Sequence, residues 1–268
     1  MFVELLVIAG LLFFFAIIAL LLGYDKLNQY HLILDTPTSK VRSLALGVVE
    51  VKGRPYNPEF MKTPHSHSDC VYYKYKTYEY QIQDPSHPVM TSGWFKISDG
   101  TDKTAFYVND STGYVLVKPQ ESVDIVRQKK VLYEPRPGTD AKLTIINRIK
   151  RWLYGDFTLL KKTGTGFYEF EPDEYIPFAT RVGNRKIYEY YIGPEDDVYV
   201  LGTAKHDENA HNMVVIEKGE DEPTFIISNR SEESLLTDSR FSAHSSYKAA
   251  VILIILSIMT FLGGFILM

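Results

Sequence analysis

Residues Ala249 to Met268 read AAVILIILSIMTFLGGFILM and carry no charged side chain. At about 1.5 Å of rise per residue, a helix of this length covers about 30 Å, which is the thickness of the hydrocarbon layer of a bilayer. Backbone amides in lipid must be satisfied within the segment itself, so the stretch predicts a membrane-spanning helix. The sequence ends there, and we therefore expect the working residues to precede this helix.

A second apolar segment opens the chain, with an uninterrupted run from Leu5 to Leu22. A cleaved signal peptide would require a positively charged start and a small-residue cleavage site, whereas this start carries Glu4. We predict an uncleaved transmembrane helix over residues 1–23, a β-rich domain over residues 24–248 and a second transmembrane helix over residues 249–268. The protein would then be a two-pass integral membrane protein.

Charge around the two helices bears on which side of the membrane holds the domain. Lys26, Lys40 and Arg42 follow the first helix, and Arg230, Arg240 and Lys248 precede the second, whereas the outer tails carry no Lys or Arg. The positive-inside rule therefore favours a cytoplasmic domain.

Composition excludes several classes of function. The 268 residues have a formal net charge of −4 and no basic stripe, so we expect no nucleic-acid partner. The single cysteine, Cys70, excludes an internal disulfide and a Cys-rich zinc site. The motifs GxSxG, HExxH and GxxxxGK[ST] are absent from the sequence. We predict no catalytic residue and no cofactor, although a membrane-bound hydrolase with an unrecognised cleft stays open as an alternative.

The middle of the chain predicts a mainly β domain, either a sandwich or barrel-like. Aromatic and β-branched runs alternate with turn residues. In Cys70–Ile82 the tyrosines change phase near Thr77, which suggests a β-bulge. Phe106–Val117 predicts a hairpin with its turn at Asp110–Gly113. The other predicted strands are Leu44–Gly53, Val123–Tyr133, Lys186–Ile192, Val198–Ala204, Asn212–Glu217 and Thr224–Ile227.

Two shorter patterns add to this picture. Val49–Gly53 (VEVKG) echoes Val198–Gly202 (VYVLG), which a duplicated β-unit would explain. Ala141–Tyr154 has apolar residues on one side and basic residues on the other, and predicts an amphipathic helix. It would either lie on an anionic membrane surface or close one face of the β-domain. The candidate membrane-surface residues are Arg148, Lys150, Arg151 and Trp152.

One cluster has the composition of a metal site. On an extended strand His65, His67 and Asp69 would share one face, where imidazoles and a carboxylate are able to hold a divalent cation. The alternative is an ordinary polar loop leading into the next strand. Cys70 should not be an activated thiolate, because the adjacent negative charge of Asp69 raises a thiol pKa.

Two surfaces are candidates for binding a protein partner, namely the tyrosine-rich strand and the tip of the predicted hairpin. Tyrosine combines a large apolar ring with a polar end and is enriched at interfaces, although it is also common in ordinary sheets. The candidate residues are Tyr72, Tyr73, Tyr75, Tyr78 and Tyr80 in the strand, and Asn109, Asp110, Ser111, Thr112 and Gly113 in the tip.

The whole arrangement resembles a known family, the GIDE or BAM (beside a membrane) domain of the membrane-anchored ubiquitin ligases of the mitochondrial MAPL type. In that family a β-rich domain lies between two transmembrane helices, and a RING finger follows. The stretches that carry the resemblance are residues 47–53 (GVVEVKG), Thr63-Pro64 leading to residues 70–73 (CVYY), residues 106–117 (FYVNDSTGYVLV) and residues 197–202 (DVYVLG).

The resemblance implies a protein partner and a domain on the intermembrane-space side, which differs from the side that the charges favour. A RING finger binds zinc through several Cys and His ligands, and this sequence has one cysteine. We therefore expect a membrane-anchored scaffolding or partner-binding module without a RING. The alternative within the family is the substrate-binding subunit of a ligase whose RING is on another chain.

Overall fold

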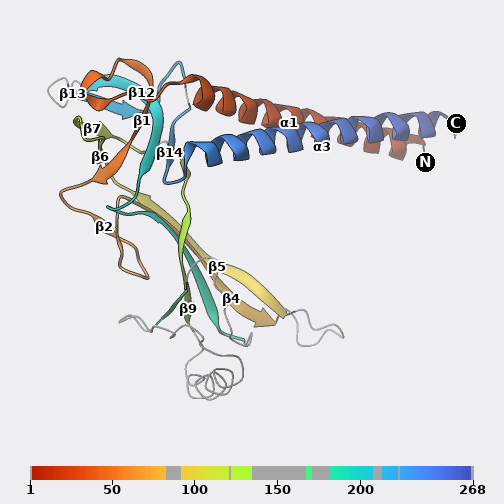
Figure 1. The fold of residues 1–268 in the computed structure, drawn as a ribbon. Coiled ribbons are helices and arrows are strands. Elements are labelled where there is room, and N and C mark those ends of the chain that lie inside the picture. The colour runs from red at the N-terminus through yellow and green to blue at the C-terminus, as the bar shows by residue number, and fades with distance from the viewer. Residues whose placement is uncertain are drawn as a thin grey trace, which may run out of the picture.

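The computed structural model describes residues 2–82, 92–120, 122–134, 167–170, 182–207, 213–222 and 224–266. Two long helices lie side by side and project from a β-rich body, and the two chain termini lie together at the far end of the helices (Figure 1). The predicted fold class, a mainly β domain flanked by two apolar helices, is therefore confirmed. The predicted amphipathic helix over residues 141–154 lies outside the described residues.

The two helices are longer than the apolar segments that predict them. Helix α1 covers Phe2–Asp35 and helix α3 covers Glu232–Ile266. Both are long and apolar enough to cross a membrane, by length and composition. Each helix continues past its apolar run on the side of the β body, α1 over residues 24–35 and α3 over residues 232–248. At about 1.5 Å per residue, these polar extensions add roughly 18–25 Å of helix.

Small side chains form the contact between the two helices. The Ser257 hydroxyl donates a hydrogen bond of 2.9 Å to the backbone carbonyl of Ala9. Small buried residues recur every seventh position on both helices, which lets two antiparallel helices approach closely along their length. They are Ala9, Ala16 and Gly23 on α1, and Ala243, Ala250 and Ser257 on α3.

The first sheet, sheet A, contains seven of the described strands in the order β1-β6-β7-β13-β12-β14-β8. An additional pairing of β1 with β12 closes part of it into a barrel-like ring. The strands are β1 (Gly47–Tyr56), β6 (Phe106–Asn109), β7 (Tyr114–Val117), β8 (Val123–Ile125), β12 (Val198–Asp207), β13 (Met213–Glu217) and β14 (Ile226–Ser228).

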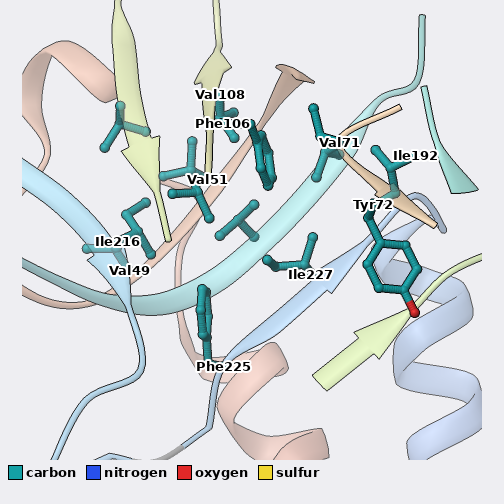
Figure 2. Packing of buried hydrophobic residues seen from close by; sticks show 14 of the residues in the cluster. Val49, Val51, Val71, Tyr72, Phe106, Val108, Ile192, Ile216, Phe225 and Ile227 are labelled. Atoms are coloured by element: carbon teal, nitrogen blue, oxygen red, sulfur yellow. The ribbon is translucent and has the colours of Figure 1, made fainter. Parts of the chain in front are cut away.

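The interior of sheet A follows from alternation along its strands. Val49 and Val51 of β1 point into the main core, together with Phe106 and Phe225 (Figure 2). The first five residues of β12, Val198–Gly202, are buried on both faces of the sheet. One face contributes Val198 and Val200 to that core, and the other packs against the base of the helices. This second cluster consists of Tyr199, Leu201 and Ile226 from the sheet with Ile33 and Leu235 from the helices.

The second sheet, sheet C, extends away from the helices (Figure 1). Its described strands have the order β10-β9-β11-β4-β5. Neighbouring strands among those described are antiparallel throughout this sheet. The strands are β4 (Tyr72–Ile82), β5 (Ser92–Lys103), β9 (Gln128–Glu134), β10 (Tyr168–Phe170) and β11 (Arg185–Ile192). Tyr72 and Ile192 join this sheet to the core of sheet A.

Most of the predicted strands occur where the sequence places them. The Phe106–Val117 hairpin forms as β6 and β7. The predicted strand Val123–Tyr133 is divided between β8 of sheet A and β9 of sheet C. Strand β5 was not predicted from the sequence. A two-stranded ribbon of β2 (Met61–Lys62) and β3 (Asp69–Cys70) and a short 3₁₀ helix, η1 (Val41–Ser43), complete the described elements.

The two segments that echo each other in sequence are partners in space. Val49 lies opposite Gly202, Val51 opposite Val200 and Gly53 opposite Val198 in the antiparallel pairing of β1 with β12. The VEVKG and VYVLG motifs are therefore related by a local two-fold axis at the Val51–Val200 pair.

A buried carboxylate ties the helices to sheet A. Glu50 is 1% exposed and accepts hydrogen bonds from the hydroxyls of Tyr199 (2.8 Å) and Thr38 (2.5 Å). Lys52 forms ion pairs with Glu50 at 3.0 Å and with Glu232, the first residue of α3. Burial, together with the adjacent charge of Glu50, raises the pKa of Tyr199, so its hydroxyl remains a donor. The buried charge is thereby compensated, as burial requires.

Candidate partner-binding surface

Strand register decides which tyrosines share a face of sheet C. Strand β4 pairs with β11 without interruption, with Tyr78 opposite Lys186 and Lys76 opposite Tyr188. The register shift expected near Thr77 occurs between Thr77 and Tyr78 in the pairing with β5. The extra residue is Ile97 of β5, because Ser98 pairs with Thr77 and Lys96 pairs with Tyr78. Strand β4 therefore alternates regularly, and its tyrosines are distributed over both faces of the sheet.

One face of sheet C forms a shallow groove of about 380 Å³ lined by aromatic and lysine side chains. Its rings pack edge to face: Tyr78 and Tyr188 have centroids 5.6 Å apart, and Tyr80 and Trp94 are 5.4 Å apart. The lining residues are Lys76, Tyr78, Trp94, Gln128, Lys186, Tyr188 and Tyr190. We call this surface the lysine–aromatic groove.

Two ammonium groups lie over ring faces in this groove. The Lys186 Nζ is 4.3 Å from the centroid of Trp94, and the Lys76 Nζ is 5.9 Å from that of Tyr190. Burial lowers the pKa of Lys186. Burial also raises the pKa of Tyr188 and of Tyr190, and the Tyr78 hydroxyl contributes in the same direction. The groove thus holds partly desolvated cations beside neutral phenols.

The predicted partner-binding tyrosines divide into three groups. Tyr78 and Tyr80 belong to the groove face. Tyr72 is 4% exposed and belongs to the main core. Tyr73 and Tyr75 lie on the opposite face of β4, where the Tyr75 ring lies 5.0 Å from the ring of His65.

The opposite face of sheet C contains a buried carboxylate held by a loop. Glu189 of β11 is 1% exposed and accepts backbone hydrogen bonds from His65 (3.0 Å) and Ser66 (3.3 Å). The Glu189 Oε2 and His65 Nε2 atoms are buried and have no hydrogen-bond partner among the described residues. Burial lowers the pKa of His65, which keeps the imidazole neutral. The hydroxyls of Thr63, Ser66 and Ser68 bond to one another and hold the loop.

The three candidate metal ligands do not converge. His65 faces Glu189 and Tyr75, whereas Asp69 forms an exposed ion pair of 2.8 Å with Lys62. No group of three His, Cys, Asp or Glu residues able to hold a metal ion occurs in the described part of the chain. Cys70 is buried, and burial followed by the charges of Glu189 and Asp69 raises its pKa to about 12, as expected for an inactive thiol.

The hairpin tip has structural partners within the chain. The Asp110 carboxylate accepts hydrogen bonds from the Thr112 amide (2.9 Å), the Thr112 hydroxyl (2.7 Å) and the Val41 amide (3.0 Å). The Thr112 hydroxyl accepts a hydrogen bond from the backbone amide of Arg42, and the Asn109 side-chain oxygen accepts one from the backbone amide of Ser111. Burial alone would raise the pKa of Asp110, but these hydrogen bonds outweigh it and lower the pKa to about 2. The tip therefore anchors η1, the segment that follows α1.

Of the seven residues that line the groove, only Tyr78 was among the predicted partner-binding residues. Trp94 lies in the strand that was not predicted, and Lys186, Tyr188 and Tyr190 lie in a predicted strand that was not singled out as a surface. Strand β11 reads RKIYEYYI and shows the same mixture of tyrosine and lysine as β4, which was the available signal. The candidate membrane-surface residues Arg148, Lys150, Arg151 and Trp152 lie outside the described residues.

Fold and surface together define a β-rich body carried on two apolar helices, with a cationic aromatic groove on its outer sheet. The family model that matches the chain is GIDE, described as E3 ubiquitin ligase, and it matches residues 162–263. The matched part contains β10 to β14 and nearly all of α3, so the resemblance to the GIDE family is confirmed over that part of the chain. Searches of curated proteins and of solved structures find no match.

Proposed function

We propose that this protein is a membrane-anchored scaffolding module that holds a partner-binding β body at a fixed height and orientation over a bilayer. The observation that carries the proposal is the packing of both helices against one face of sheet A. Ile33 of α1 and Leu235 of α3 are buried against Tyr199, Leu201 and Ile226. A body packed onto its anchors in this way has a defined orientation, which a flexible linker would not give.

The same geometry sets the distance from the membrane. If the apolar parts of α1 and α3 span the bilayer, their polar extensions form a stalk of roughly 18–25 Å. This stalk lifts sheet A away from the lipid surface, and sheet C extends from sheet A to one side of the helix pair (Figure 1).

Affinity purification of the full-length protein after cross-linking in native membranes tests the proposal. We expect the double variant Trp94→Ala/Tyr188→Ala to lose most of the protein recovered with the wild type, because both rings line the groove. The matched control is Tyr114→Ala, which removes an exposed aromatic ring from sheet A. Equal recovery with all three proteins, or no specific recovery with the wild type, would contradict a partner-binding role for the groove.

A second candidate function is substrate binding for a ubiquitin-type ligase, and the GIDE match favours it. In this role the groove would bind the substrate, and a RING on another chain would recruit the ubiquitin-charged enzyme. Adding the purified protein to a reconstituted ubiquitination reaction should then raise modification of its cross-linked partner only when a RING protein is present. An unchanged rate with the RING protein present would rule out this role for the pair tested.

A further inference from the structure

The lysine–aromatic groove continues into a second hollow toward sheet A. This hollow has a volume of about 240 Å³, is lined by Tyr72, Lys74, Lys76, Ile125, Val126 and Tyr190, and shares Lys76 and Tyr190 with the first. The two hollows thus form a continuous furrow that begins at Trp94 on the outer strand and ends at Val126, beside β8. Its length suits an extended segment of several residues.

Charge in the furrow has one sign. Lys74, Lys76 and Lys186 contribute ammonium groups, and none of the described residues that line the two hollows is acidic. No ion pair joins any of these three lysines to an acidic residue of the described chain, although the protein as a whole has a net charge of −4. Exposed lysines elsewhere on the body do have such partners: Lys62 pairs with Asp69, and Lys205 pairs with Glu217. Asp99 of β5 lies opposite Lys76 but pairs with Lys96 at 3.3 Å, so this face of sheet C keeps a net positive charge around the furrow.

We propose that this furrow binds an extended acidic segment of a partner protein, with carboxylates at alternate positions. The inference rests on the proposed function and names the chemistry of the partner. Lys74 and Lys76 are two residues apart on β4, which places them about 7 Å from each other on one face. Carboxylates at positions i and i+2 of an extended peptide have the same spacing. Lys186 lies diagonally across from Lys76, within the 7–8 Å that separates such neighbours, and receives a third carboxylate.

The ring geometry favours carboxylates over nucleobases. Single-stranded nucleic acids bind to exposed ring faces on which successive bases stack. Here Tyr78 packs edge to face on Tyr188, and the faces of Trp94 and Tyr190 lie under lysine ammonium groups. The rings thus hold Lys76 and Lys186 in place, and at Lys186 an incoming carboxylate meets a partly desolvated cation.

Fluorescence anisotropy with the full-length protein in detergent micelles tests this inference. The probe is a labelled eight-residue peptide of alternating Glu and Ser, compared with a peptide of alternating Lys and Ser and with a single-stranded oligo(dT). We expect the acidic peptide alone to bind, and to bind less tightly as the salt concentration rises. Lys76→Glu/Lys186→Glu should weaken binding on the order of tenfold or more, because two attractive contacts become repulsive. Lys62→Glu/Lys205→Glu has the same change in net charge and should bind like the wild type.

The outcomes separate the two proposals. No binding of the acidic peptide, or equal loss in both double variants, overturns the acidic-segment inference. Binding of oligo(dT) that depends on Lys76 and Lys186, without peptide binding, overturns it in favour of a nucleic-acid surface. If the acidic peptide fails while Trp94→Ala/Tyr188→Ala still abolishes partner recovery, the scaffolding function stands and only the acidic character of the partner is wrong.

Discussion

Sheet A and sheet C use their polar residues in opposite ways. In sheet A the buried carboxylate of Glu50 has partners on both oxygens, and those partners come from the segment that follows α1 as well as from the sheet. In sheet C the buried Glu189 keeps one oxygen without a hydrogen-bond partner among the described residues. On the groove face of this sheet, Lys76 and Lys186 lie over aromatic rings and form no ion pair with a described acidic residue.

This difference suggests that one sheet stabilises the protein and the other binds a partner. Satisfied buried groups and a closed ring of strands resist local opening, whereas partly satisfied polar groups on an open sheet retain capacity for a ligand. We therefore assign stability and orientation to sheet A and recognition to sheet C. Substitutions that affect one sheet and leave the other unchanged test this assignment.

The largest effect is expected from a cavity in the core of sheet A. Phe106 is 1% exposed and packs among Val51, Val108 and Phe225 (Figure 2). We predict that Phe106→Ala lowers the free energy of unfolding by about 3–5 kcal/mol, the usual cost of removing a buried aromatic ring. Denaturant titration in detergent micelles, followed by circular dichroism, measures this loss.

The matched control removes the same side chain from an exposed position. Phe241 on α3 is 74% exposed, and Phe241→Ala should change the free energy of unfolding by less than about 0.5 kcal/mol. A similar small change for Phe106→Ala would show that the core of sheet A is not what holds the body together, and the comparison between the sheets would fail.

Replacing a glycine by alanine in each sheet should change the free energy of unfolding by an intermediate amount, with a loss in sheet A and no loss in sheet C. A Cβ atom on Gly53 of β1 would lie 2.3 Å from the backbone oxygen of Asn109, so Gly53→Ala requires the strands to separate. We predict a loss of about 1–3 kcal/mol, as for other overpacked sites. On Gly93 of β5 the nearest atom would be 3.7 Å away, on Phe95. Gly93→Ala should be neutral or stabilise by about 0.4–1 kcal/mol, because it restricts the unfolded chain. A loss at Gly93 matching that at Gly53 would contradict the comparison.

Most of sheet A could be predicted from the sequence because its strands and turns are encoded by neighbouring residues. Strands with alternating valines and a hairpin turn rich in Asp, Ser, Thr and Gly encode β1, β6, β7 and β12 directly. Strand β5 escaped prediction since SGWFKISDGTDK combines two glycines, two aspartates and two serines, all of which are unfavourable in isolated strands. Its eleven pairings with β4 override that local preference.

The candidate site was harder to predict, for a geometric reason. The tyrosines of β4 change phase in the sequence, and a bulge within that strand would have placed Tyr73, Tyr75, Tyr78 and Tyr80 on one face. The extra residue lies in β5 instead, so the tyrosines divide between faces. Which strand of a pair carries a bulge depends on the partner, and a single sequence does not encode that directly. The polar helix extensions were missed for a similar reason, because packing against sheet A supports helix beyond the apolar runs.

The smallest effect is expected at the hairpin tip, where it depends on pH. Asp110 accepts two hydrogen bonds from Thr112 and one from the Val41 amide, and so joins the tip of sheet A to the segment that follows α1. Asp110→Asn keeps the shape but removes the charge, and should lower the free energy of unfolding at pH 7 by about 1–2 kcal/mol. Asp197→Asn, at a carboxylate with a 93% exposed side chain, is the control and should change little.

The pH dependence tests the cause of that loss. The pKa of Asp110 is about 2 in the folded protein and 3.8 as its ordinary value, so the unfolded chain binds the proton more readily. Its contribution to stability is therefore complete above about pH 5, declines as the pH falls through 3.8, and is lost near pH 2. The difference in stability between wild type and Asp110→Asn should shrink over the same range. A difference that stays constant from pH 7 to pH 3 would mean that shape rather than charge holds the tip, and sheet A would then owe less to its satisfied carboxylates.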